Sequence, residues 1–185
     1  AAAVVPAPEA PAPVALLSSE AGIEVMQPQT PLAQDQIAID TISYDEQGAV
    51  ALAGRGRGAA SVRVYLDNRP LITTRIAADG RWQAALPDVA TGTYTLRVDQ
   101  IDDAGEVTAR AESPFRRESA EVLAAAADPA VAVRAVTVQP GHTLWAIART
   151  RYGQGIDYVK VFEANRSQIR DPDLIYPGQV FAIPD

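Results

Sequence analysis

The sequence contains no cysteine, which excludes disulfide bonds and metal sites built from thiolates. It has one histidine, His142, and no nucleophile together with an orienting partner can be assigned to it from the neighbouring sequence. No run of about twenty apolar residues occurs, so the sequence predicts no membrane-spanning helix. These absences leave little from which to build an active site. We expect a protein that is not an enzyme and that has no cofactor or metal.

Positive charge is also scarce, since 16 Lys and Arg stand against 23 Asp and Glu for a net charge of −7. Residues 136–185 contain equal numbers of acidic and basic side chains, so the excess of negative charge lies in the residues before them. Proteins bind nucleic acid by neutralising its phosphates with clustered cations. An acidic chain without a basic patch is poorly suited to that task, and we predict no nucleic-acid partner.

Two segments of the chain, residues 1–19 and 119–134, are rich in small side chains. Residues 1–19 begin with an Ala/Pro-rich stretch, which favours an extended, solvated chain. It is either a spacer or a tail without a role. Residues 119–134 are Ala-rich and join two differently patterned regions, as a short helix capped by Ser119 or as a loop. Because the chain starts with Ala rather than Met, we expect a trimmed piece whose targeting segment lies outside it.

Residues 20–118 alternate between apolar and polar side chains in short segments, which is typical of strands that bury one face. Val62, Val64 and Leu66, for example, fall on one face. The pair Asp79-Gly80 predicts a hairpin turn. About seven such strands predict an antiparallel β-sandwich. The predicted strands are Ile23–Met26, Ile37–Ile42, Val50–Leu52, Ser61–Leu66, Leu71–Ala77, Trp82–Leu86, Thr93–Val98 and Val107–Phe115.

Three short motifs in this region resemble those of bacterial immunoglobulin-like repeats. They are Asp79-Gly80-Arg81-Trp82, Gly92-Thr93-Tyr94-Thr95-Leu96 and Asp102-Asp103-Ala104-Gly105. The resemblance implies an immunoglobulin-like β-sandwich over residues 20–118. Such modules are mostly spacers or adhesion units of envelope proteins, and the fold by itself assigns no function.

Residues 135–185 change to a pattern of two short strands around two helices. Val136–Val138 is apolar, and the turn Gln139-Pro140-Gly141-His142 follows it. Thr143 is placed to cap a helix whose buried stripe is Leu144, Ile147 and Ala148. A break at residues 152–155 precedes a second helix over about 157–165, with Val159 and Phe162 turned inward and Tyr158 as a further candidate for that face. A polar loop then leads to a last strand over 179–183, in which Phe181 and Ile183 share a face.

This pattern resembles the LysM module over its whole length. The residues that carry the resemblance include Pro140-Gly141, Thr143-Leu144, Tyr152-Gly153, Phe162–Asn165 and Ile175–Gln179. The family has a βααβ fold and binds N-acetylglucosamine (GlcNAc) glycans, most often peptidoglycan. Two departures stand out: His142 replaces the usual Asp, and the segment from Asn165 to Ile175 is long. That long segment is similar to a LysM variant found behind the BON domain of a small bacterial potassium-binding protein and in some phage tail proteins.

The resemblance also implies where the glycan lies, in a shallow groove between the loop after the first strand and the loop before the last strand. Backbone groups would pair with acetamido groups while apolar side chains pack on sugar rings. The implied glycan-binding residues are Gly141, His142, Thr143, Leu144, Asp173, Leu174, Ile175, Tyr176 and Gly178.

Two further features have competing readings. Asp99, Asp102, Asp103 and Glu106 are close together, but they lack the full ligand set of a calcium loop, and turn formation is the more economical reading. Trp145 either stacks on a sugar or packs beside the buried stripe of the first helix.

The resulting hypothesis is a non-catalytic peptidoglycan-binding protein of the bacterial cell envelope or periplasm, in which the LysM module anchors an immunoglobulin-like module. Its predicted partners are peptidoglycan or GlcNAc oligomers, and possible further partners are envelope proteins. Two alternatives stay open. The module docks another protein in an envelope or phage-tail-like complex, or it is a small-ion-binding relative.

Overall fold

The computed structural model describes residues 16–19, 22–25, 32, 35–45, 47–127 and 135–184. The chain divides into two compact units, residues 1–31 and 32–185. In the first unit, β1 (Leu16–Ser19) and β2 (Gly22–Val25) form an antiparallel pair. β1 therefore occupies the last four residues of the predicted linker 1–19, while residues 1–15 lie outside the described part of the chain.

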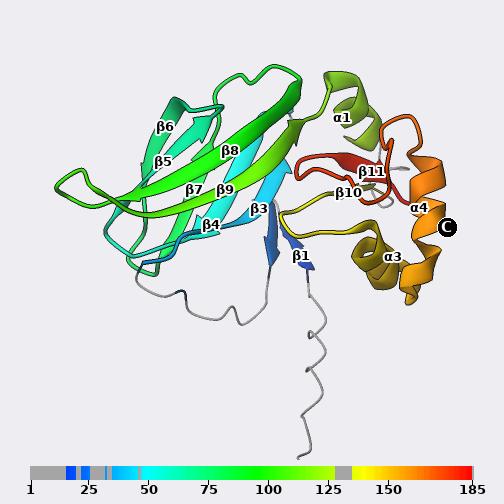
Figure 1. Ribbon diagram of the computed structural model, residues 1–185, viewed down its shortest axis with the longest axis horizontal. Helices are drawn as coiled ribbons and strands as arrows, with labels where there is room; N and C mark the ends of the chain where they lie inside the picture. The colour runs from blue at the N-terminus through cyan, green and yellow to red at the C-terminus, as the bar shows by residue number, and fades with distance from the viewer. Residues whose placement is uncertain are drawn as a thin grey trace, which may run out of the picture. The chain divides into compact units, whose positions relative to one another are not determined.

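Two antiparallel sheets make up most of the second unit (Figure 1). The first has the order β3-β4-β7, with β3 (Ala38–Tyr44), β4 (Val50–Arg55) and β7 (Arg81–Ala85). The second has the order β6-β5-β8-β9, with β6 (Arg69–Arg75), β5 (Ser61–Leu66), β8 (Gly92–Ile101) and β9 (Val107–Arg117). The strands predicted within residues 37–115 are all present, with their ends shifted by a few residues.

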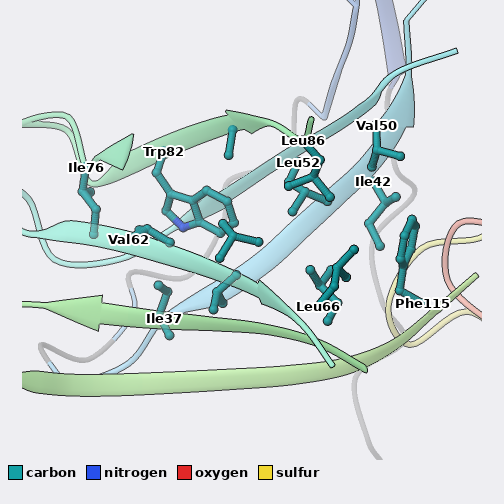
Figure 2. Close-up of a cluster of buried hydrophobic side chains, with 14 of the residues drawn as sticks. Ile37, Ile42, Val50, Leu52, Val62, Leu66, Ile76, Trp82, Leu86 and Phe115 are labelled. Atoms are coloured by element: carbon teal, nitrogen blue, oxygen red, sulfur yellow. The ribbon is translucent and has the colours of Figure 1, made fainter. Parts of the chain in front are cut away.

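One hydrophobic core receives side chains from both sheets. Ile42 and Leu52 come from the first sheet and meet Val64 and Phe115 from the second, as part of one cluster of buried residues. Figure 2 shows these apolar side chains filling the space between the strands, with the Trp82 ring among them. Trp82 is only 2% exposed. The alternation predicted for β5 is confirmed, since Val62, Val64 and Leu66 are all buried.

The Asp79-Gly80 pair forms a turn but no hairpin, so that prediction was wrong. The Gly80 N–H donates to the Ala77 carbonyl at 2.9 Å. The strands on either side do not pair with each other, because β6 joins β5 and β7 joins β4. The turn chemistry fixes only the reversal of the chain. The sheet that the next strand joins is decided by burial, and β7 buries Trp82 and Ala84 against the common core.

The acidic residues around the β8–β9 turn are used locally. Asp102 Oδ1 accepts the backbone N–H groups of Ala104 and Glu106, both at 2.9 Å. Asp99 is 1% exposed and accepts Nε–H of Arg110 at 2.7 Å. Turn formation and an ion pair therefore account for the two residues.

The Ala-rich joint begins with a helix, α1 (Ala120–Ala127). Ser119 Oγ accepts the N–H of Val122 at 3.3 Å, as expected of a capping residue. Residues 128–134, the rest of the predicted linker, lie outside the described residues. The domain boundaries proposed at either end of this joint stay predictions. In the described ranges no helix is long and apolar enough to cross a membrane.

The last fifty residues form a small α+β region (Figure 1). β10 (Ala135–Thr137) and β11 (Val180–Ala182) pair antiparallel. Between them lie α3 (Leu144–Tyr152), a 3-10 turn, η1 (Gly155–Asp157), and α4 (Tyr158–Ala164). The predicted order of strand, helix, helix and strand is confirmed. A separate core joins these elements, made of Val138, Leu144, Ile147, Ala148, Val161, Ile169, Phe181 and Ile183.

Of the α4 residues predicted to face inward, Tyr158 and Phe162 pack against the core, but Val159 does not. Val159 is 48% exposed, whereas Val161 is fully buried. The buried face of the helix continues at Asn165, which is 2% exposed. Its Nδ2 donates to Val161 O at 2.7 Å and to Ala182 O at 2.8 Å, and its Oδ1 accepts Ala182 N–H at 2.9 Å. A polar residue therefore occupies a core position. The spacing of the apolar residues alone does not show which face of α4 is buried.

Candidate functional site

The turn after β10 is held by hydrogen bonds among its own residues. The N–H of His142 donates to Gln139 O at 3.0 Å, and the N–H of Gln139 donates to His142 Nδ1 at 3.3 Å. Gly141 between them has φ +83°, a left-handed conformation that glycine adopts without the usual steric cost. The His142 ring is consequently tied back onto the turn rather than free to rotate.

Thr143 then starts α3 in the predicted way. Its backbone is extended, with φ −126° and ψ 156°, and its Oγ1 accepts the N–H of Ala146 at 3.1 Å. Leu144 is the first helical residue and is 2% exposed, so its side chain anchors the start of the helix in the core. This fixes the helix start beside the turn.

Trp145, the next residue of the helix, is 50% exposed. Its indole lies against the backbone of Gly155, where an added Cβ would come within 2.0 Å of the ring. The Arg149 guanidinium carbon lies 5.5 Å from the ring centroid. Trp145 is thus packed against η1 while much of its surface remains accessible.

The second loop, before β11, is fixed at both ends. Asp171 accepts the Asp173 N–H on its Oδ1 at 2.9 Å and the Leu174 N–H on its carbonyl at 3.0 Å. Further along, the Tyr176 N–H donates to Gln179 Oε1 at 2.6 Å. These bonds hold Ile175 between two constrained turns.

The two loops enclose a groove of about 280 Å³ on the surface of this region. One wall comes from the start of α3 and the other from the loop before β11, with α4 contributing a tyrosine. The lining residues are His142, Thr143, Leu144, Trp145, Tyr158, Pro172, Asp173 and Ile175. Aromatic and aliphatic surface therefore faces a few polar groups, the combination found in small-ligand sites.

The structure brings together five of the sequence-predicted site residues and not the other four. His142, Thr143, Leu144, Asp173 and Ile175 line the groove. Gly141, Leu174, Tyr176 and Gly178 are not among the lining residues, and Gly178 is buried at a different place, against Phe115. Their roles in glycan binding stay predictions.

Sequence reasoning missed Tyr158 and Pro172 as lining residues, and it left Trp145 undecided between stacking and packing. Helical spacing carries a signal for Tyr158, because the buried face of α4 passes through Val161 and Phe162 and places Tyr158 at its edge. No comparable signal marks Pro172. Its position follows from the turn that Asp171 forms.

The electrostatics of the groove are weak. His142 is exposed at the surface, but partial desolvation of its ring lowers its pKa, which favours the neutral imidazole. Asp173 is the acidic residue in the lining. Among the described residues, no group of three or more His, Asp or Glu side chains is arranged to hold a metal ion.

Comparison with known families decides what this region is. Residues 136–184 match the LysM domain family. These residues form a LysM domain. LysM domains bind peptidoglycan and related carbohydrates, so the groove between the two loops lies in a domain of a carbohydrate-binding family. The sequence resemblance stated above is confirmed for this part of the chain.

A known protein matches part of this chain. The potassium binding protein Kbp of Escherichia coli O6:H1 is 49% identical to this chain over 59 residues. The aligned segment covers 32% of this chain and 40% of the relative, so the chain spans less than half the length of that protein. No solved structure was found to match.

Proposed function

We propose that this chain is a non-catalytic peptidoglycan-binding protein of the bacterial cell envelope. The observation that carries the proposal is the groove, because it lies between the two loops where the LysM resemblance implies the glycan to lie. The rest of the proposal follows from what the groove offers to a sugar chain.

The lining suits a GlcNAc oligomer. A pyranose ring has an apolar C–H face that packs on aromatic and aliphatic side chains, and Trp145, Tyr158 and Ile175 supply such surface. Hydroxyl and acetamido groups need hydrogen-bond partners, and Thr143 and Asp173 lie in the lining. An open groove with few polar anchors binds weakly at one site, so residence on a cell wall would come from tethering to a repeated polymer.

We further propose that residues 37–117 are an immunoglobulin-like module that spaces the LysM domain from whatever precedes it. The order β3-β4-β7 and the order β6-β5-β8-β9 give three strands facing four around one core. Both sheets are antiparallel, and consecutive strands switch sheets between β4 and β5, between β6 and β7, and between β7 and β8. Immunoglobulin-like sandwiches have this kind of arrangement.

A second candidate function is small-ion binding. The identity to Kbp favours it, since that protein is named for potassium binding and shares 49% identity over 59 residues. The shared segment is a minority of both chains. Potassium binding is therefore tested beside glycan binding rather than placed first.

The decisive experiment is co-sedimentation of the chain with purified peptidoglycan sacculi. Wild-type chain should sediment, and Trp145→Ala should sediment less, because it removes exposed aromatic surface from the groove. Ile156→Ala is the matched control, since Ile156 is 67% exposed and lies outside the groove lining.

Wild-type chain that stays in the supernatant would reject the proposal, and a potassium titration by calorimetry would then test the second candidate. Soluble muropeptides released by pure protein would show that the chain is catalytic.

A further inference from the structure

The first loop of the groove is attached to the sheet region through Gln139. The N–H of Ile42 donates to Gln139 Oε1 at 2.7 Å, and Gln139 Nε2 donates to Ile42 O at 2.9 Å. Ile42 belongs to β3, an edge strand of its sheet. The side-chain amide therefore occupies both backbone groups of one edge residue, as a neighbouring strand would. The same Nε2 also donates to Thr137 O at 3.1 Å.

The second loop is attached to the sheet region through Tyr44 and the end of β9. Tyr44 Oη donates to Gly178 O at 2.8 Å, and the N–H of Arg116 donates to Pro177 O at 2.8 Å. Gly178 approaches so closely that an added Cβ would lie 2.4 Å from Arg116 O and 2.6 Å from a ring carbon of Phe115. Tyr44 Oη in turn accepts the N–H of Glu118 at 3.2 Å.

Both attachments are linked to the groove by hydrogen bonds. One is linked to a residue that lines the groove, and the other is linked to the neighbour of a lining residue. Gln139 exchanges hydrogen bonds with His142, which is itself a lining residue. On the other side, Gln179 follows Gly178 and holds the N–H of Tyr176, the neighbour of Ile175. The two attachments are also joined to each other, because Val138 and Gln179 pair through Val138 N–H and Gln179 O at 2.8 Å.

We propose that the sheet region is part of the ligand-binding unit, with Gln139 and Tyr44 as positioning residues that set the spacing between the two walls of the groove. The identity of the ligand rests on the proposed function, whereas the positioning of the two loops rests on the hydrogen bonds alone. It assigns the two-sheet region a role beyond that of a spacer. A LysM domain separated from the sheets would lose the partners of Gln139 and Gly178, and its groove loops would be less well fixed.

The test uses the whole chain with two substitutions that preserve shape. Gln139→Met keeps the length of the side chain but removes the amide, and Tyr44→Phe keeps the ring but removes the hydroxyl. Matched controls are Gln83→Met, an exposed position on β7, and Tyr94→Phe, whose hydroxyl donates to Ala90 O at 2.8 Å within the sheet region. Urea unfolding of every variant establishes that it is folded under the conditions of the assay.

Two readouts are taken on each folded variant. The first is the affinity for a GlcNAc tetramer, measured by calorimetry. We expect Gln139→Met and Tyr44→Phe each to weaken it about threefold to tenfold, the scale of one or two net hydrogen bonds acting through position, and the controls to leave it unchanged. The second is the set of amide resonances of residues 142–145 and 173–175 with the Trp145 indole resonance. These should shift in the two positioning variants and not in the controls.

The outcomes separate the inference from the proposed function. If wild-type chain binds no glycan, the proposed function fails, and the groove resonances alone decide the positioning role. If both positioning variants leave the groove resonances and any measured affinity as in wild type, the inference is overturned. A variant that fails to fold is replaced by the other, since the two act on different loops.

Discussion

The contact between Trp145 and Gly155 gives the sharpest prediction about the shape of the groove. A Cβ added at Gly155 would lie 2.0 Å from Cε2 of the indole, about 1.4 Å short of the 3.4 Å at which ordinary contacts begin. The backbone of Gly155 is not in the left-handed region, and the three atoms nearest to an added Cβ all belong to the Trp145 indole. In Gly155→Ala the indole must therefore move away from η1 and into the groove or the solvent.

The expected cost in stability is small, although the displacement is large. Overpacking a site costs about 1–3 kcal/mol, and the low end applies here because Trp145 is 50% exposed and has solvent to move into. Replacing glycine also lowers the entropy of the unfolded chain, which offsets about 0.4–1 kcal/mol. We expect the free energy of unfolding to change by no more than about 2 kcal/mol, while the environment of the indole and the affinity for glycan both change.

The assay combines tryptophan fluorescence, urea unfolding and glycan binding. Trp82 is 2% exposed in the other core and serves as a constant background. Gly153→Ala is the matched control, because Gly153 has φ +82° and no atom within 4 Å of an added Cβ. It should cost about 1–2 kcal/mol of stability through backbone strain and leave the Trp145 emission unchanged. Emission and affinity in Gly155→Ala that equal those of wild type would refute the described packing of Trp145.

Three further predictions concern the LysM domain. Asn165→Ala should lower the free energy of unfolding by about 2–4 kcal/mol in urea melts, because it removes the buried bridge between α4 and β11 and leaves Ala182 groups unpaired. Thr143→Ala should cost about 1 kcal/mol in the same assay, since the capping bond to Ala146 is lost. The folded pKa of His142 lies below its ordinary 6.5, so the unfolded chain binds the proton more tightly, and this contribution to stability is full above pH 6.5 and falls as the pH drops through the folded pKa. His142→Gln should remove that part of the pH dependence, and identical pH profiles for the two chains would contradict it.

Local patterns in the sequence predicted most of the strands. Alternation in β5 placed Val62, Val64 and Leu66 inside, and the structure buries all three. The same principle failed on α4, where the residue at the C-terminal cap, Asn165, is buried and its three side-chain hydrogen bonds make that burial acceptable. A pattern that counts only apolar residues does not register such a position, and Val159 was taken for the inward residue instead of Val161.

Contacts between distant segments lay beyond local reasoning. The Asp79-Gly80 turn predicted a reversal correctly, but the choice of sheet for β7 depends on β4, about thirty residues earlier in the chain. The bonds between Ile42 and Gln139 join residues separated by 97 positions. In both cases the sequence around one partner contains no pattern that identifies the distant partner. For the same reason the packing of the Gly178 backbone against Phe115 and Arg116 could not be predicted from the neighbouring sequence.

The central claim is that the groove between the two loops holds a GlcNAc glycan. Calorimetric titration of the whole chain with GlcNAc oligomers of increasing length tests it most directly. We expect measurable binding that tightens as the oligomer lengthens and weakens in Trp145→Ala but not in Ile156→Ala. Binding should also survive moderate salt, because acidic and basic side chains balance within residues 136–185. No binding at any length by the folded wild-type chain, or equal binding by the Trp145→Ala variant, would contradict it.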